Sequence, residues 1–372
     1  MTHLARALLT TLLAGDLFAC GSAPPVAPDS ALATTSASGF SGQLAWVELE
    51  TLAEAPRPLG SDGAEAARSH IAARLAAAGI AVETLGTTVE SQGFGPLALT
   101  HLVAILPGGS ADRIVLAAPY DSGQYDGFAF VGANDGASGA ALLLEVARVL
   151  AGRVLPYSME LVWIEGEGRL GRGEGDEREL RWLGSRGLAE RWAESGHLDG
   201  IRLFVVFNRV CDADLRIARD LGSHREHREA FWKAARRLGY TDAFQPNRGY
   251  ESLSSSHLAF RERGVRPVVA IEDSAFGGDE APGLYAGNEG DVAVHCSPES
   301  LGAVGTVAIE AVETIAARLA KIDRFARTPF VQPESAPPST EEVPPELAAE
   351  PEASAGAASS ENPETPDAAG AR

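Results

Sequence analysis

Five short apolar runs alternate with amphipathic stretches along most of the chain. The apolar runs are rich in Val, Ile and Leu, as buried β-strands are, and they occupy residues 101–109, 113–119, 158–166, 201–208 and 266–273. The stretches with helical spacing of apolar residues are 63–79, 138–152, 184–196, 227–239 and 297–322. This alternation predicts an α/β fold with three layers, in which helices cover both faces of a mostly parallel, twisted sheet. Ligands of such folds collect outside the carboxyl ends of the strands, so site residues are expected directly after each strand.

The two ends of the chain differ in composition from its middle. Residues 1–20 contain one arginine and an apolar stretch, and they end in Leu-Phe-Ala-Cys, which resembles the lipobox of bacterial lipoproteins. They predict a cleaved export signal, with Cys20 as the lipidated first residue of a protein anchored in the cell envelope; an ordinary signal peptide is the alternative. Residues 21–38 are small and Pro-rich and predict a flexible tether. Residues 328–372, rich in Pro, Ala, Ser and Glu, predict a disordered tail, which leaves 39–327 as the folded domain.

Charge and cysteine content narrow the classes of function. The formal net charge is −20 and no basic stripe is present, which argues against nucleic acid as a partner. After Cys20 the chain contains two cysteines, Cys211 and Cys296. Two cysteines imply no disulfide framework, and the sequence alone leaves open whether they pair.

Several short polar motifs accompany the predicted strands. They are Pro-Tyr-Asp at 119–121, Gly-Ala-Asn-Asp-Gly-Ala-Ser-Gly at 132–139, Glu-Gly-Glu-Gly at 165–168, Ser-Ser-Ser-His at 254–257 and His-Cys-Ser-Pro-Glu-Ser-Leu at 295–301. In this order they resemble the M28 metallopeptidases, a zinc aminopeptidase family that also includes glutaminyl cyclases. The resemblance covers nearly all of residues 45–320, and it implies a zinc-exopeptidase-like fold whose strand ends supply a metal site.

Most positions that bind metal in that family carry other residues here. The resemblance implies that Asp135 stands at the position of the bridging ligand and Glu167 at that of the general base. The other ligand positions hold Pro119, Gly168, Asn208 and Ala286. Zinc typically takes three or more protein ligands, with imidazole or thiolate prominent, so a lone carboxylate does not hold it. We therefore expect no cofactor and an inactive enzyme, and we expect zinc only if displaced ligands replace the missing ones.

The retained polar residues also have structural interpretations. Asp135 precedes a predicted helix and suits its N-cap or a turn. Asn208 is able to donate a hydrogen bond to Asp135 if both side chains face the former site. Asp121 is expected to cap the loop after its strand rather than to bind metal.

Two glutamates and a histidine leave structural and binding roles open. Glu165 and Glu167 flank a glycine after a strand, which is a common loop composition. His257 stands where the family often has a histidine after an aspartate, and we expect it to support or pack beside the former site.

Other side chains give further candidates. His224 and His227 are three residues apart, which would place them on one side of a helix, but the charged residues around them favour a solvated surface. His295 adjoins Cys296, and a capping role for this pair is favoured over a metal site. Trp182 is expected to line a cleft.

Three classes of function follow. The first is a non-catalytic binding or scaffolding protein that holds a peptide or an amine through Asp135, Glu165 and Glu167 and reaches the membrane through an N-terminal lipid. The second is a working aminopeptidase or glutaminyl cyclase-like enzyme with displaced metal ligands. The third is a structural envelope lipoprotein. Fold alone does not choose among them, because function depends on the site.

Overall fold

A six-stranded sheet forms the centre of the computed structural model, which describes residues 38–91, 93–171, 182–247, 249–278 and 281–327. The strand order is β1-β2-β4-β3-β5-β8. The strands are β1 (Val82–Ser91), β2 (Gly95–Leu106), β3 (Arg113–Pro119), β4 (Ser158–Ile164), β5 (Ile201–Asn208) and β8 (Val268–Glu272). The predicted export signal with Cys20, nearly all of the predicted tether and the predicted tail lie outside the described residues.

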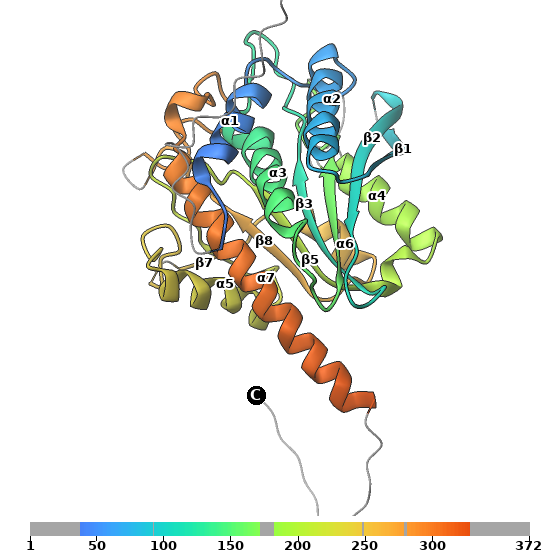
Figure 1. Cartoon of the computed structure of the whole chain (residues 1–372). Coiled ribbons are helices and arrows are strands. Elements are labelled where there is room, and N and C mark those ends of the chain that lie inside the picture. The colour runs from blue at the N-terminus through green and yellow to red at the C-terminus, as the bar shows by residue number, and fades with distance from the viewer. Residues whose placement is uncertain (1–37, 92, 172–181, 248, 279–280, 328–372) are drawn as a thin grey trace, which may run out of the picture. The chain divides into compact units, whose positions relative to one another are not determined.

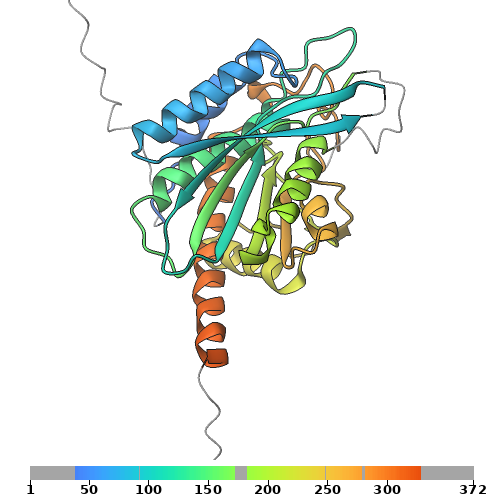
Figure 2. The same ribbon diagram turned by 90° about the vertical axis from the view of Figure 1, so that its right-hand side faces the viewer.

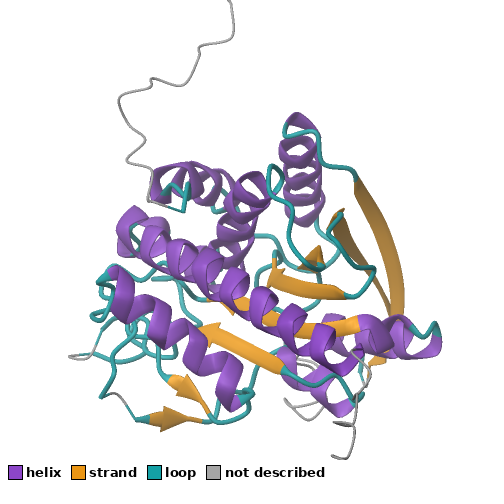
Figure 3. Cartoon of the chain, turned by 60° about the horizontal axis from the view of Figure 1, so that its bottom comes forward, coloured by secondary structure: helices purple, strands orange, loops and turns teal. Residues whose placement is uncertain are grey.

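Four of the six strands are parallel, as the alternation of apolar runs predicts. β4, β3, β5 and β8 run in one direction, whereas β2 is antiparallel to β4 and pairs with β1 in an antiparallel hairpin (Figure 2). All five predicted runs are strands. A second, two-stranded sheet consists of β6 (Arg219–Asp220) and β7 (Tyr250–Glu251), the two short arrows in Figure 3. The fold class predicted from sequence is therefore confirmed.

Helices cover both faces of the sheet (Figure 1). The larger core contains residues of α1 (Gly42–Leu52), α2 (Asp62–Ala77), α3 (Ser138–Leu150), α5 (Arg225–Leu238) and α7 (Pro298–Arg327). The smaller core contains residues of α4 (Leu183–Glu194) and α6 (His257–Glu262). Side chains of β3 alternate between the two cores: Ile114 and Leu116 join the larger one, and Val115 and Ala117 the smaller, because successive residues of a strand point to opposite faces.

Helix α7 is the one described helix long and apolar enough to cross a membrane. Its candidate segment is Pro298–Arg324, and 72% of the most apolar window is buried inside the protein. α7 packs against α1 and α5, and its apolar residues belong to the larger core.

A disulfide between Cys211 and Cys296 joins the loop after β5 to the segment before α7, with an S–S distance of 2.17 Å. This resolves the pairing that the sequence left open. It also leaves Cys296 without a free thiol, which a metal site formed with His295 would need. The capping role is wrong as well, because Ser297 accepts the hydrogen bond from the Ser300 amide in the first turn of α7, and His295 instead stacks on Tyr285.

Candidate functional site

Three of the predicted site residues, Asp135, Glu167 and Asn208, line one cavity at the carboxyl ends of the parallel strands. It has a volume of about 130 Å³, and we call it the cleft. Its lining comprises Gly123, Tyr125, Phe130, Asp135, Glu167, Gly168, Arg169, Trp182, Asn208, Arg209, Ser254, Ser255, Ser256 and Glu272. Trp182 lies in this lining, as predicted. The arrangement agrees with the rule that open α/β sheets carry their sites at this edge.

Asp135 and Asn208 form the hydrogen bond expected from the sequence. Asn208 Nδ2 lies 2.8 Å from Asp135 Oδ1, and Asn208 Oδ1 accepts hydrogen bonds from the amides of Gly136 and Arg209, at 3.0 and 2.9 Å. The expected N-cap role of Asp135 is wrong, because helix α3 begins at Ser138 and receives no side-chain cap. The amide of Asn208 therefore fixes the orientation of the Asp135 carboxylate.

Glu167 has its carboxylate oxygens engaged by three donors. Oε1 accepts hydrogen bonds from the Ser185 amide at 2.6 Å and the Ser185 hydroxyl at 2.8 Å, and Oε2 accepts one from the Ser256 hydroxyl. Burial raises the pKa of Glu167 above its ordinary value, and this effect exceeds the lowering by the two serines. The residue at the general-base position is thus held by neutral groups of the protein.

Asp121 joins the loops that follow β3 and β4. Its two carboxylate oxygens accept hydrogen bonds from the amides of Glu167 and Gly168, at 3.2 and 3.1 Å. Burial, assisted by the negative charge of Glu167, raises the pKa of Asp121 to about 8. The loop-capping role predicted for Asp121 is present in the structure, although the loop it caps follows the neighbouring strand.

The backbone closes one of the positions expected to lack a metal ligand. A Cβ atom at Gly168 would lie 2.6 Å from the carbonyl carbon of Ser122 and 2.7 Å from its oxygen, closer than real Cβ contacts come. Pro119 is buried as the last residue of β3 and is paired in register with Ile164. A glutamate at position 168 therefore does not fit the present course of the chain.

Glu165, His257 and Ala286 do not line the cleft. The Glu165 carboxylate lies 2.7 Å from Arg68 Nη1 and accepts a hydrogen bond from the Thr100 amide, so of the two roles left open for Glu165 the structure shows the structural one. His257 is fully buried, and its Nε2 lies 3.0 Å from Asp220 Oδ2. The preceding residue, Ser256, donates a hydrogen bond to Glu167, so His257 packs beside the site.

Several residues of the site had no signal in the sequence. Arg209 has a positive φ of 50° and pairs with Glu272. Arg57 is fully buried and donates hydrogen bonds to the carbonyl groups of Tyr120 and Gly132, which tie together the segments carrying Asp121 and Asp135. Burial lowers the pKa of Arg57 to about 10, against the opposing effect of nearby carboxylates.

The residues of the cleft do not fit a zinc ion. Of the five ligand positions of the family pattern, only Asp135 carries a side chain of the expected type, and its Oδ1 already accepts a hydrogen bond from Asn208. Nowhere in the described part of the chain do three or more His, Cys, Asp or Glu side chains form a group able to hold a metal. Zinc sites usually need three or four protein ligands.

The histidine pair outside the cleft differs from expectation. The Nδ1 atoms of His224 and His227 are 2.6 Å apart, so the two rings do face one another. His227 is only 4% exposed, and burial lowers its pKa to about 4. The predicted solvated surface is therefore wrong for His227. This residue lies on the same side of α5 as the buried Phe231, four residues later.

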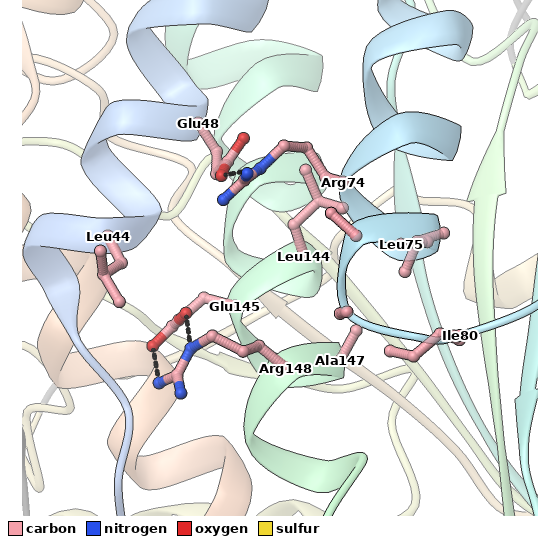
Figure 4. A pocket seen from close by; sticks show the side chains of 11 residues that line it. Leu44, Glu48, Arg74, Leu75, Ile80, Leu144, Glu145, Ala147 and Arg148 are labelled. Atoms are coloured by element: carbon pink, nitrogen blue, oxygen red, sulfur yellow. Dashed lines mark hydrogen bonds and ion pairs between the residues drawn. The ribbon is translucent and has the colours of Figure 1, made fainter. Parts of the chain in front are cut away.

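A second cavity, of about 230 Å³, lies among α1, α2 and α3, and we call it the helical groove (Figure 4). Leu44, Leu75 and Leu144 contribute apolar lining. Two ion pairs occur in it, Glu48 with Arg74 and Glu145 with Arg148, each 2.6 Å long. None of the site residues predicted from sequence lines this groove.

Solved structures place the fold in a defined class. The glutaminyl cyclase of an Acidobacteriales bacterium superposes with a TM-score of 0.68 and 29% identity, covering 80% of this chain and 99% of that one. A Zn-dependent exopeptidase from Parabacteroides distasonis shares the fold, with a TM-score of 0.66 and 20% identity over 74% of this chain and 98% of its own. The architecture is therefore that of the zinc-dependent exopeptidases and glutaminyl cyclases.

Sequence comparison gives the family. Residues 101–312, more than half of the chain, match Peptidase family M28. A glutaminyl-peptide cyclotransferase of the snake Boiga irregularis is 28% identical over 263 residues, which cover 58% of this chain and 67% of that protein. The chain belongs to peptidase family M28, and the resemblance stated from its motifs is confirmed.

Proposed function

We propose that this protein is a catalytically inactive member of family M28 that uses its former catalytic cleft to bind a ligand without converting it. The observation that carries the proposal is the state of Glu167. A general base must reach a proton on a substrate or water, but both oxygens of Glu167 already accept hydrogen bonds from Ser185 and Ser256.

The metal-binding half of the site supports the same conclusion. Asn208 donates an N–H group to Asp135 at 2.8 Å, which occupies an oxygen lone pair that a cation would otherwise use. The backbone around Gly168 excludes the side chain of a glutamate. Without a metal there is no Lewis acid and no acidified water for a base to act on.

A binding role is supported over a purely structural one by the open cleft. The cavity of about 130 Å³ combines polar groups with aromatic ones. Tyr125 and Phe130, whose ring centroids are 4.8 Å apart, line it together with Trp182. Asp135 and Glu167 supply carboxylates that suit the amine of a peptide or a small amine ligand. Export and a lipid at Cys20, predicted from the first 20 residues, would place this cleft in the cell envelope.

The test combines metal content, turnover and binding in the purified protein. Elemental mass spectrometry before and after dialysis against zinc measures retained metal, and peptides with N-terminal glutamine or with free N-terminal residues measure cyclase and aminopeptidase turnover. We expect no stoichiometric zinc, no turnover and saturable binding of an amine-bearing peptide. The Acidobacteriales glutaminyl cyclase serves as a control for the assay.

The outcomes separate the three classes of function. Stoichiometric zinc together with turnover would overturn the proposal in favour of an active enzyme with displaced ligands. Neither zinc nor ligand binding would favour a structural envelope protein. A Trp182→Ala variant that keeps its thermal stability but loses peptide affinity would locate the binding in the cleft, because Trp182 lines it.

A further inference from the structure

Arg209 is positioned in the cleft by an unusual backbone conformation. Its φ is 50°, and Trp182 is the only other described non-glycine residue with positive φ. Side chains with a Cβ atom rarely adopt this region, and strain of this kind persists where the surrounding structure holds the residue in place. Arg209 directly follows Asn208, which ends β5, so the strained turn directs the arginine side chain into the cleft lining.

Carboxylates surround the Arg209 guanidinium. Glu272 forms an ion pair with it and is only 3% exposed. Glu272 lies opposite Asn208 in the register of β5 and β8, so the pair spans two neighbouring strand ends. Burial alone would lower the pKa of Arg209, but Glu272, Asp135 and Asp273 outweigh burial and raise it above its ordinary value. A buried carboxylate is costly unless it is paired, so these groups need a cation.

Two other arginines near the cleft, Arg57 and Arg169, contact groups other than Glu272. Arg57 donates its hydrogen bonds to backbone carbonyl groups, among them those of Tyr120 and Gly132, and does not line the cavity. Arg169 lines the cavity, but its guanidinium lies over the ring of Tyr125, 5.5 Å from the centroid. Arg209 lines the cleft together with Asp135 and forms an ion pair with Glu272, which also lines it.

We propose that the Arg209 guanidinium is a resident cation that takes the place of a metal ion in holding the carboxylates of the cleft together. A guanidinium suits this task because it is permanently charged and presents several N–H donors in one plane. The role concerns the integrity of the cleft and does not depend on which ligand the cleft binds. It explains why an M28 cleft with most metal-ligand positions replaced retains buried acidic side chains.

Chemical rescue tests the proposal. Arg209→Gly removes the guanidinium without adding backbone strain, because glycine readily adopts positive φ. The greater freedom of glycine in the unfolded chain also costs some stability, and guanidinium ion does not restore that part. We expect Tm to fall by about 5–10 °C, as for breaking a buried ion pair. Guanidinium chloride at about 50 mM should then raise the Tm of the variant by about 2 °C in a saturable way, because the ion fills the vacated place.

Controls separate rescue from general salt effects. Sodium chloride at the same concentration should not raise the Tm of Arg209→Gly, and guanidinium should not raise the Tm of the unmodified protein. Arg263→Gly removes an arginine from the exposed pair with Glu190 and should show no rescue. An Arg209→Gly variant as stable as the unmodified protein, or one that guanidinium does not stabilise, would overturn the resident-cation role.

A second pair of variants distinguishes charge from packing. Arg209→Lys keeps a cation and Arg209→Met keeps a similar length of apolar chain, and both retain the strained backbone. We expect the lysine variant to have the higher Tm, and an equal or lower Tm would contradict the proposal. Stabilisation of Arg209→Gly by zinc but not by guanidinium would also contradict it. Zinc bound to the unmodified protein would instead contradict the inactive-enzyme proposal, so the two failures are distinguishable.

Discussion

The cleft and the helical groove both contain buried carboxylates, but they treat the negative charge in different ways. In the groove, Glu48 lies 2.6 Å from Arg74 (Figure 4). It also lies 2.7 Å from His70 of α2. In the cleft, Glu167 is held by the amide and hydroxyl of Ser185 and by the hydroxyl of Ser256. One carboxylate has charged or chargeable partners and the other has only neutral donors.

The pKa values of the two glutamates move in opposite directions as a result. Burial raises the pKa of Glu48, but His70 and Arg74 outweigh burial and bring it below its ordinary value. Burial raises the pKa of Glu167, and the serines do not outweigh it. The groove is therefore built as a structural ion-pair site, whereas the cleft retains a carboxylate at the family's general-base position and engages it mainly through hydrogen bonds from neutral groups.

The largest expected effect comes from forcing a metal ligand back into the cleft. Pro119→His combined with Gly168→Glu should unfold the protein or destabilise it by about 4 kcal/mol, because the new side chain at position 168 meets the Ser122 backbone and brings a buried charge. Activity should not appear, since position 208 is still an asparagine. Gly171→Ala, with no atom within 4 Å of the added Cβ, is the matched control and should be nearly neutral. Measurable aminopeptidase activity in the double variant would contradict the assignment of the ligand positions.

The second-largest effect is expected at Asn208, the amide that stands at a ligand position of the family. Asn208→Asp places a carboxylate against Asp135, removes the 2.8 Å hydrogen bond and should cost about 2–4 kcal/mol at pH 7. One of the two acids would then have a raised pKa, so the cost should decline as the pH is lowered and that acid gains a proton. Urea unfolding at pH 5 and pH 8 measures this. Equal losses at both values would show that charge repulsion is not the cause.

A smaller effect is expected in the groove. Glu48→Gln removes a carboxylate whose folded-state pKa is lowered, so its contribution is present above its ordinary pKa and is lost as the pH falls through the folded-state value. The loss at pH 7 should be about 1 kcal/mol, because Arg74 is half exposed and solvent screens the pair. Thermal unfolding from pH 3 to pH 7 should show the two proteins converging at acidic pH. A constant difference would exclude an electrostatic origin.

The smallest effect is expected at the general-base position. Glu167→Gln keeps an oxygen for both Ser185 donors and gains an amide NH2 group that donates to the Ser256 hydroxyl oxygen. Because the folded-state pKa of Glu167 is raised, folding loses stability as the pH rises above the ordinary value of 4.5. The variant should match the unmodified protein at low pH and be slightly more stable, by about 1 kcal/mol, at pH 8. A large loss at pH 8 would mean that the charge of Glu167 is stabilising, and the contrast with Glu48 would fail.

The sheet was readable from sequence where strands are buried on both faces. The runs at 113–119 and 201–208 coincide with β3 and β5, because central parallel strands are continuously apolar. β1 gave no such signal: it lies at the edge of the sheet, most of its residues are exposed or half-buried, and half of them are threonine or glutamate. The short helix α6 was missed as well, because six residues are too few for a helical period to stand out.

In the site, a contact could be predicted from sequence where the two side chains are a matched hydrogen-bond donor and acceptor. A side-chain amide after β5 and a carboxylate before α3 predicted the Asn208–Asp135 hydrogen bond, which is present. The sequence left the role of Glu165 open, because it does not reveal that Gly166, with a φ of 85°, turns the chain between Glu165 and Glu167. Arg209 carried no signal, since its direction depends on a positive φ that the sequence does not reveal.

The disulfide between Cys211 and Cys296 would hold the two parts of the chain together after a cut between them. It encloses a segment spanning 85 positions, which contains α5, α6 and β8. Tyr250 lies in this segment and is 58% exposed, which makes it accessible to a protease of aromatic specificity. A chain cut there would stay covalently joined, so it would run as one band on a gel without reductant and as two bands with it.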